Sequence, residues 1–170
     1  IFPPCDELLP QTIQNLAEKH HLLPERGNAA PFQSSLSDLP GRSPVLCAGC
    51  PHRSTFFLLN KMKLPVAGDI GCYNLGTLPP FNAQHTMGSM GASIGVAHGV
   101  SKAGIAQKNV AVIGDSTFFH TGMPALLNVA YNQSDTIVMI LDNRITAMTG
   151  HQENPGTGKT LMEQPTYAVD

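Results

Sequence analysis

The 170-residue sequence has no tryptophan and few charges: aromatic residues make up 6% of it and charged residues 13%. It also lacks an apolar run of the roughly 20 residues that a membrane-spanning helix needs. Its net charge of −2 gives no reason to expect a nucleic acid or an acidic membrane as a partner. With 42% hydrophobic residues, we expect a globular, cytoplasmic protein with a single core.

The two ends of the sequence point to a piece of a longer polypeptide. The first residue is Ile1 rather than Met, and only two obvious strands of the main unit precede Asp170. We expect residues 1–40 to contain a helix that starts at Pro10, followed by a linker rich in Ser and Pro. Residues 41–170 are expected to form the main domain, truncated at its C-terminal end.

Two apolar runs in the second half of the sequence have the pattern of buried β-strands, residues 110–113 and 137–141. Between them, residues 124–131 have apolar side chains spaced as in a helix. A parallel strand-helix-strand unit places the C-terminal ends of its two strands side by side. The sequence therefore predicts an α/β fold with a parallel sheet, which brings Asp115 and Asn143 together.

Each apolar run ends in a turn that carries a carboxylate, Gly114-Asp115-Ser116 and Asp142-Asn143. One carboxylate, one side-chain amide and a nearby backbone carbonyl form an oxygen set that suits Mg²⁺ bound also to phosphates. Gly114 lets the backbone approach a phosphate closely, and the following helix offers its N-terminal amides. The pattern predicts a diphosphate cofactor held through a metal.

These two turns resemble the diphosphate-binding signature of thiamine diphosphate enzymes, usually written GDG, a spacer, then NN. Ser116 and Asp142 depart from the commonest form of that signature. The wider segments GDSTFFHTGMPALLNVAYN and ILDNRITAMTGHQ look specifically like the 2-oxoacid:ferredoxin oxidoreductases that act on indolepyruvate. The resemblance covers roughly residues 44–152.

The resemblance implies a thiamine diphosphate-binding fold, in which helices lie on both faces of the parallel sheet. It implies oxidative decarboxylation of aryl 2-oxoacids such as indolepyruvate to acyl-CoA, with coenzyme A and ferredoxin as partners. It also implies a second subunit and an oligomer. Thiamine enzymes place the Glu that activates the cofactor on a separate domain, which is not visible in this sequence. We therefore expect the 170-residue chain alone to be inactive.

The same resemblance assigns roles to individual residues. Asp115, the side-chain oxygen of Asn143 and the backbone carbonyl of Ile145 would bind Mg²⁺, and residues 146–149 would donate to phosphate oxygens. The residues expected to contact the cofactor are Gly71, Cys72, Met87, Gly88, Gly114, Asp115, Ser116, Asn143, Ile145, Thr146, Met148 and Thr149.

Three cysteines, Cys47, Cys50 and Cys72, are compatible with several chemistries. The C-x-x-C pair suits a dithiol redox couple, and His52 could complete a zinc site, although one close pair is weak evidence for zinc. Ordinary reduced thiols are a further alternative. The resemblance adds a [4Fe-4S] cluster with these three cysteines as ligands. Such a cluster normally needs four thiolates, and because the remaining cysteine is Cys5, we expect the fourth beyond the C-terminal end.

Three further features admit a functional and a structural interpretation. His52 is a candidate catalytic residue that assists the substrate or the cluster, with packing in a turn as the alternative. Asp69 follows a buried strand, and a structural hydrogen bond is its preferred role. Small residues recur in a predicted helix at 85–104, and since glycine costs a helix about 1 kcal/mol relative to alanine, they imply a close contact. Only residues 85–88, at the predicted helix start, are expected to face the site.

The segment 156–160, GTGKT, ends like a phosphate-binding P-loop. Glu153 stands where the full pattern needs glycine, and no apolar strand precedes it, so we expect a flexible loop without a nucleotide. Two other functions remain open. The chain could belong to a non-oxidative thiamine diphosphate decarboxylase or carboligase, which would not need the three cysteines. It could also be a non-catalytic α/β module that binds a nucleotide or a metal.

Overall fold

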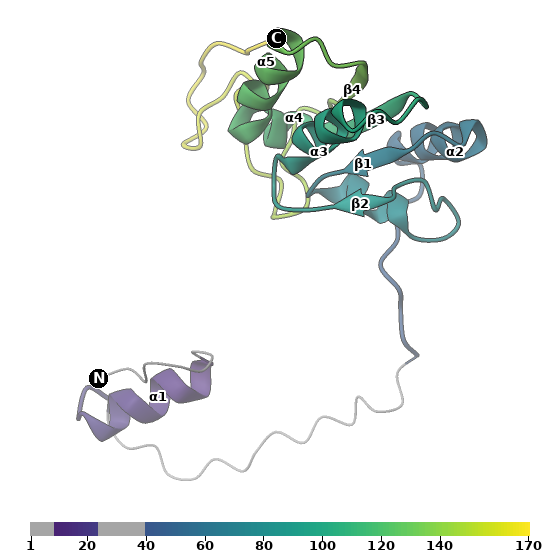
Figure 1. Ribbon diagram of the computed structural model, residues 1–170. Coiled ribbons are helices and arrows are strands. Elements are labelled where there is room, and N and C mark those ends of the chain that lie inside the picture. Colours follow the sequence, from purple (N-terminus) through teal and green to yellow (C-terminus); the bar gives the residue numbers. More distant parts are fainter. Residues whose placement is uncertain (1–8, 24–39) are drawn as a thin grey trace. The chain divides into compact units, whose positions relative to one another are not determined.

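The computed structural model describes residues 9–23 and 40–170 (Figure 1). The chain divides into two units, Ile1–Arg42 and Ser43–Asp170. The first unit contains helix α1, Pro10–Lys19, which starts at proline as predicted. Proline suits this position because the first amides of a helix have no acceptor within the helix, so its missing N–H costs no hydrogen bond. Cys5 and almost all of the predicted linker lie outside the described residues.

The second unit is built on a parallel sheet of four strands in the order β2-β1-β3-β4 (Figure 1). Their bounds are Val66–Gly68 for β1, Thr86–Met87 for β2, Asn109–Gly114 for β3 and Thr136–Leu141 for β4. β3 and β4 pair along their whole length, from Asn109 opposite Thr136 to Gly114 opposite Leu141. The predicted α/β fold with a parallel sheet is confirmed.

Helices pack against this sheet at His52–Met62 (α2), Ala92–Lys102 (α3), Asp115–Thr117 (α4) and Met123–Tyr131 (α5). A 3-10 helix, η2, covers Cys72–Thr77, and a π-helical turn, η3, covers Phe118–Gly122. The crossover segment predicted at residues 124–131 forms α5, with Pro124 in its first turn. α4 and η3 precede α5 without a break, so the helical segment already begins at Asp115. The π-helical turn precedes Pro124, whose nitrogen cannot donate to the helical ladder. None of the helices described within 9–23 and 40–170 has the length and apolar character needed to cross a bilayer.

The side chains of β3 alternate between two hydrophobic clusters, one on each face of the sheet. Val110 and Val112 belong to a cluster that includes Phe56 of α2 and residues of η2. Ala111 and Ile113 belong to a second cluster, with residues of α3 and α5. Every residue of β3 is therefore buried, which explains why its sequence is a continuous apolar run.

Asp69 joins the end of β1 to the start of α3. Its side chain is completely buried, and its carboxylate accepts hydrogen bonds from the amides of Gly91 at 2.7 Å and Ser93 at 2.9 Å. It also accepts one from the amide of Ile70 at 2.8 Å. A negative charge is favourable at a helix N-terminus, where amides lack partners within the helix. The structure therefore supports the structural interpretation of Asp69.

The segment 85–104 differs from the single helix that was predicted. Its start forms the short strand β2, and α3 begins only after Gly91, whose φ of +87° is left-handed. The expected close contact is also missing at two glycines of α3. A methyl group on Gly95 or Gly99 would meet no atom within 4 Å among the described residues. Among the described residues, no close contact therefore explains why α3 has glycine at these two positions.

We expect Gly99→Ala to raise the free energy of unfolding by about 0.4–1 kcal/mol, because alanine restricts the unfolded chain and fits this helical position without a clash. Urea unfolding monitored by circular dichroism measures the change. Gly91→Ala is the matched control and should lose stability, since its backbone is left-handed and a methyl group would lie 2.0 Å from the Thr121 Oγ1. A loss of stability in Gly99→Ala would show that this face has a close neighbour.

Candidate cofactor site

A cavity of about 140 Å³ lies where β3 and β4 end. This edge of a parallel sheet is where α/β proteins usually bind ligands. Because Gly114 pairs with Leu141, the two turns that follow these strands lie at the same level of the sheet. The cavity is lined by residues from three segments, 70–73, 114–117 and 141–149, and by His52 and Met90.

Most residues predicted to contact a cofactor line this cavity. They are Gly71, Cys72, Gly114, Asp115, Ser116, Asn143, Ile145, Thr146, Met148 and Thr149. Met87 and Gly88 are not among the lining residues, because the segment they belong to ends β2 instead of starting a helix. Met90, a few positions further along, lines the cavity in their place. The assignment of these residues to a cofactor remains a prediction.

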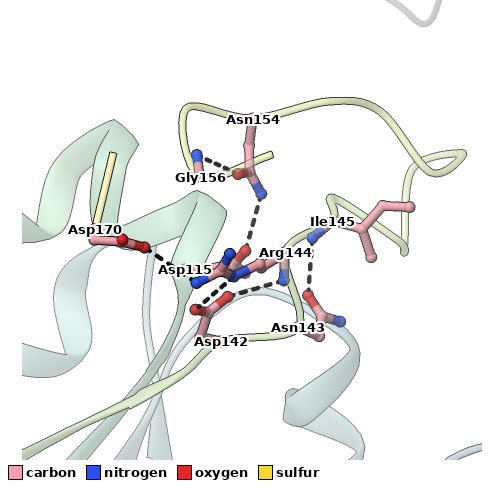
Figure 2. Close-up of polar contacts among 8 residues, drawn as sticks. All are labelled: Asp115, Asp142, Asn143, Arg144, Ile145, Asn154, Gly156 and Asp170. Atoms are coloured by element: carbon pink, nitrogen blue, oxygen red, sulfur yellow. Dashed lines mark hydrogen bonds and ion pairs between the residues drawn. The ribbon is translucent and has the colours of Figure 1, made fainter. Parts of the chain in front are cut away.

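Asp115 is the carboxylate at the centre of the candidate site (Figure 2). It is the first residue of α4, and its side chain is only 6% exposed. Its Oδ2 accepts a hydrogen bond from the Nδ2 of Asn154 at 2.9 Å. Asp142, in the neighbouring turn, is exposed and does not line the cavity; its Oδ1 accepts a hydrogen bond from the Arg144 amide at 2.9 Å. The two carboxylates therefore have different roles.

Asn143 and Ile145 belong to a tight turn that places both residues on the cavity (Figure 2). The Oδ1 of Asn143 accepts a hydrogen bond from the Ile145 amide at 3.2 Å, and Arg144 between them has a left-handed φ of +53°. An amide oxygen has two lone pairs, so Asn143 keeps one for a further partner. The turn thus holds the Asn143 side chain without consuming its capacity to bind a cation.

Together, Asp115, Asn143 and Ile145 offer only oxygen atoms and a single negative charge. This donor set fits Mg²⁺, which usually binds proteins through one or two carboxylates and takes other ligands from phosphate and water. Within residues 9–23 and 40–170, no three His, Cys, Asp or Glu side chains form a group that could hold a metal ion. The candidate set is of another kind, since only one of its members is a carboxylate.

The hydroxyl groups near the cavity are engaged in a local network. The Thr146 hydroxyl donates to the Ser116 Oγ at 2.8 Å, and the Thr149 hydroxyl donates to the Gln152 Oε1 at 2.8 Å. Backbone hydrogen bonds between Thr146 and Gln152 close the loop. Because Ser116 accepts from Thr146, its own proton can be donated to a ligand. The loop hydroxyls predicted to bind phosphate thus fix the loop, and Ser116 is the better placed donor.

Tyr73 packs beneath the cavity and was not anticipated from the sequence. Its side chain is 5% exposed, and its hydroxyl donates to the Ile70 carbonyl at 2.5 Å. A methyl group on Gly71 would lie 2.3 Å from the Tyr73 ring, and one on Gly114 would lie 2.5 Å from it. Burial raises the pKa of Tyr73, so the hydroxyl stays protonated at neutral pH. The structure thus supplies a reason for Gly114 that the sequence did not suggest, the proximity of an aromatic ring.

His52 is the first residue of α2 and is 6% exposed. Its ring meets the ring of Tyr73 edge-on, with centroids 6.4 Å apart and planes at 83°. Burial lowers the pKa of His52 below 6.5, and the negative charge of Asp115 opposes part of that effect. At neutral pH the candidate site therefore contains an uncharged imidazole.

The lowered pKa of His52 makes folding sensitive to acid. As the pH falls below about 6.5, His52 takes up a proton in the unfolded chain before it does so in the folded chain. The contribution of His52 to the free energy of unfolding is therefore fully present above that pH and is lost as the pH falls below it. We expect His52→Gln to lose less stability than the wild type between about pH 6.5 and pH 5, by at most about 1.4 kcal/mol per pH unit. Urea unfolding at several pH values measures this. The same loss of stability with acid in His52→Gln as in the wild type would contradict the role of His52.

Of the three predicted cluster cysteines, Cys72 lines the cavity, and Cys50 and Cys72 pack against the same hydrophobic cluster. Cys47 is exposed, Cys50 and Cys72 are half-buried, and the Cys50 amide donates to the Cys47 carbonyl at 3.1 Å in a turn before α2. Burial raises the pKa of Cys72, and the nearby Cys50 and Cys47 act in the same direction. The three cysteines do not form a metal-holding group within the parts of the chain that the structure describes.

Comparison with protein families identifies the domain. Residues 69–170, more than half of the chain, match the family described as "Thiamine pyrophosphate enzyme, C-terminal TPP binding domain". The chain belongs to this family. Thiamine pyrophosphate is another name for thiamine diphosphate, and the matched residues include both strand-end turns, so the predicted resemblance to thiamine diphosphate enzymes is confirmed.

This thiamine pyrophosphate domain is also similar to curated proteins named indolepyruvate oxidoreductase subunit IorA. It is 53% identical to the protein of Pyrococcus abyssi over an alignment of 138 residues, and the match covers 72% of this chain and 21% of that protein. It is 45% identical to the protein of Methanothermobacter marburgensis over an alignment of 166 residues, and the match covers 92% of this chain and 25% of that protein. The chain thus spans about a fifth to a quarter of the length of these relatives.

Two residues of the thiamine pyrophosphate domain that surround Asp115 were missed at the level of sequence, Tyr73 and Asn154. Tyr73 carried no signal beyond its place after the Gly71-Cys72 turn. Asn154 precedes Pro155 and Gly156, a combination typical of a turn, but it lies before the loop predicted at residues 156–160 and no role was predicted for it. In the structure, Asn154 and Gly156 are both buried and hydrogen-bonded to each other.

Proposed function

We propose that this domain binds thiamine diphosphate and Mg²⁺ in an enzyme that oxidatively decarboxylates aryl 2-oxoacids, such as indolepyruvate, to acyl-CoA. One observation carries the proposal: Asp115, Asn143 and Ile145 line a single cavity at the ends of β3 and β4. The relatives named indolepyruvate oxidoreductase subunits support the substrate class. Coenzyme A, and ferredoxin as the electron acceptor, are proposed from the resemblance of the sequence motifs.

In this proposal, Asp115, the amide oxygen of Asn143 and the carbonyl of Ile145 bind Mg²⁺. The Ser116 hydroxyl and the first amides of the helix that starts at Asp115 bind the diphosphate. When bound, thiamine diphosphate supplies an electron sink for decarboxylation of the 2-oxoacid. His52, uncharged and adjacent to the cavity, is the candidate to accept or donate a proton there.

The [4Fe-4S] cluster is proposed for the whole protein and not for the described residues alone. Cys47, Cys50 and Cys72 supply three thiols, and a fourth ligand has to come from outside the described residues. The relatives' description as a subunit supports a second subunit as a partner. Iron and sulfide analysis of the anaerobically purified whole protein should find about four of each for every cluster. Their absence would instead favour a non-oxidative decarboxylase or carboligase.

Isothermal titration calorimetry tests the proposed cofactor directly. Thiamine diphosphate should bind in the presence of Mg²⁺ and should bind much more weakly after removal of divalent cations with EDTA. ATP with Mg²⁺ serves as the comparison, because it also offers a diphosphate but lacks the thiamine rings. Equal binding with and without EDTA would reject the metal, and binding of ATP alone would favour a nucleotide-binding module.

A further inference from the structure

We propose that Asn154 is a positioning residue that orients the Asp115 carboxylate for the metal, and that the turn at residues 154–157 exists to hold Asn154 in place. The inference rests on the proposed function, because it assumes that Asp115 binds Mg²⁺. It concerns a residue outside the diphosphate signature, two positions before the segment 156–160 that resembles the end of a P-loop.

The contact between Asn154 and Asp115 is direct and buried (Figure 2). The Asn154 Nδ2 lies 2.9 Å from the Asp115 Oδ2, and the two side chains are 7% and 6% exposed. The two residues lie 39 positions apart in the sequence. A buried ionised carboxylate needs hydrogen-bond donors, and a bond to a charged group is stronger than a bond between neutral groups. Asn154 therefore supplies what the Asp115 carboxylate requires in this environment.

The orientation of the Asn154 amide follows from its second bond. Its Oδ1 accepts a hydrogen bond from the Gly156 amide at 2.9 Å, which only an oxygen can do. The Nδ2 end is therefore the one that faces Asp115. The turn itself is closed by the Thr157 amide and hydroxyl, which donate to the Asn154 carbonyl at 3.0 Å and 2.9 Å. Backbone and side chain together thus fix the direction of the donor.

The two oxygens of the Asp115 carboxylate therefore have different roles. Oδ2 is held by Asn154, which restrains rotation of the carboxylate, and in this proposal Oδ1 is the oxygen that binds the metal. Because asparagine is neutral, it adds this restraint without changing the charge of the site. Groups that orient metal ligands in this manner typically cost about 10–100-fold in metal affinity when they are removed.

Asn154→Ser removes the hydrogen bond to Asp115 and keeps an acceptor for the Gly156 amide. A serine hydroxyl can still accept from the Gly156 amide, as asparagine and serine side chains both do in turns, but it is too short to reach Asp115. In the full chain with thiamine diphosphate present, we expect this variant to bind Mn²⁺ about 10–100-fold more weakly than the wild type, as measured by electron paramagnetic resonance. Its thermal unfolding midpoint without metal should fall, because the buried Asp115 carboxylate loses a donor, so Mn²⁺ binding is measured well below that midpoint.

Thr157→Val is the matched control, because it removes a hydrogen bond from the same turn without touching Asp115, and it should bind Mn²⁺ like the wild type. Asp115→Asn reports on the proposed function itself. If Asp115→Asn abolishes Mn²⁺ binding while Asn154→Ser binds normally, the positioning role is rejected and the proposed function stands. If Asp115→Asn binds normally, the metal site itself is rejected. Equal losses of stability in Asn154→Ser and Thr157→Val, with normal Mn²⁺ binding, would assign Asn154 a purely structural role.

A measurement on the unmodified chain complements these variants, so that the test survives if Asn154→Ser fails to fold. In an NMR titration with thiamine diphosphate and Mg²⁺, the side-chain amide signal of Asn154 should shift on binding. The side-chain amide of Asn132 donates to Asn128 at the end of α5 and should not shift. An unchanged Asn154 signal at saturating Mg²⁺ would overturn the inference.

Discussion

Asp115→Asn is expected to lower the affinity for thiamine diphosphate in the presence of Mg²⁺ by about 100-fold or more, which corresponds to about 2.8 kcal/mol. The substitution keeps the size of the side chain and leaves an oxygen that can accept from Asn154. It removes the charge of the single carboxylate among the described residues that line the cavity. Because Mg²⁺ depends on anionic oxygen, the diphosphate loses its link to the protein. Calorimetric titration at fixed Mg²⁺ measures the change.

Asp142→Asn provides the comparison for this experiment. It removes the same charge from the neighbouring turn, and the new side chain can still accept from the Arg144 amide. Asp142 is exposed and does not line the cavity, so its replacement should change affinity by no more than a few-fold. Similar losses in both variants would indicate a general charge effect. Wild-type affinity in Asp115→Asn would contradict the assigned metal site.

Gly114→Ala is expected to destabilise the fold by about 1–3 kcal/mol, the usual range for overpacking a core. Its methyl group would lie 2.5 Å from the Tyr73 ring. The ring cannot move aside easily, because it is buried and its hydroxyl is hydrogen-bonded to the Ile70 carbonyl. The backbone of Gly114, with φ −81° and ψ 159°, suits any residue, so the effect should come from the clash alone. Urea unfolding measures it.

A double-mutant cycle isolates the clash. Tyr73→Leu removes the aromatic ring, and Gly114→Ala should cost less in that background than in the wild type. A coupling energy within about 0.5–3 kcal/mol is typical of residues in direct contact. Additive costs would show that the methyl group meets a different neighbour, and the Tyr73 ring would then not explain the glycine at position 114.

The arrangement of β3 and β4 could be predicted because it depends on local patterns. A continuous apolar run of four or five residues that ends at Gly or Asp is typical of a strand in a parallel sheet. β3 is buried on both faces, whereas Ile137 and Ile140 of β4 are exposed among the described residues. The meeting of Asp115 and Asn143 then followed from the rule that parallel strands end at the same edge of the sheet. No knowledge of side-chain packing was needed for either step.

Contacts that depend on packing could not be predicted in this way. Nothing in the sequence near Asn154 indicates that its amide reaches Asp115, because the loop between them can take many paths. The same is true of Tyr73, whose neighbours Gly71 and Gly114 come from the ends of different strands. The prediction of a single helix at 85–104 was wrong for a different reason. Glycine and other small residues permit both a helix and the turn that precedes α3.

The burial of Tyr73 has a practical consequence for spectroscopy. Without tryptophan, the ultraviolet emission of the chain is dominated by three tyrosines. Two of them, Tyr131 and Tyr167, are 84% and 91% exposed, whereas Tyr73 is 5% exposed and lies against the cavity. A change in fluorescence on addition of a ligand can therefore be traced to one buried phenol, and the domain carries an optical reporter of its own site without an added label.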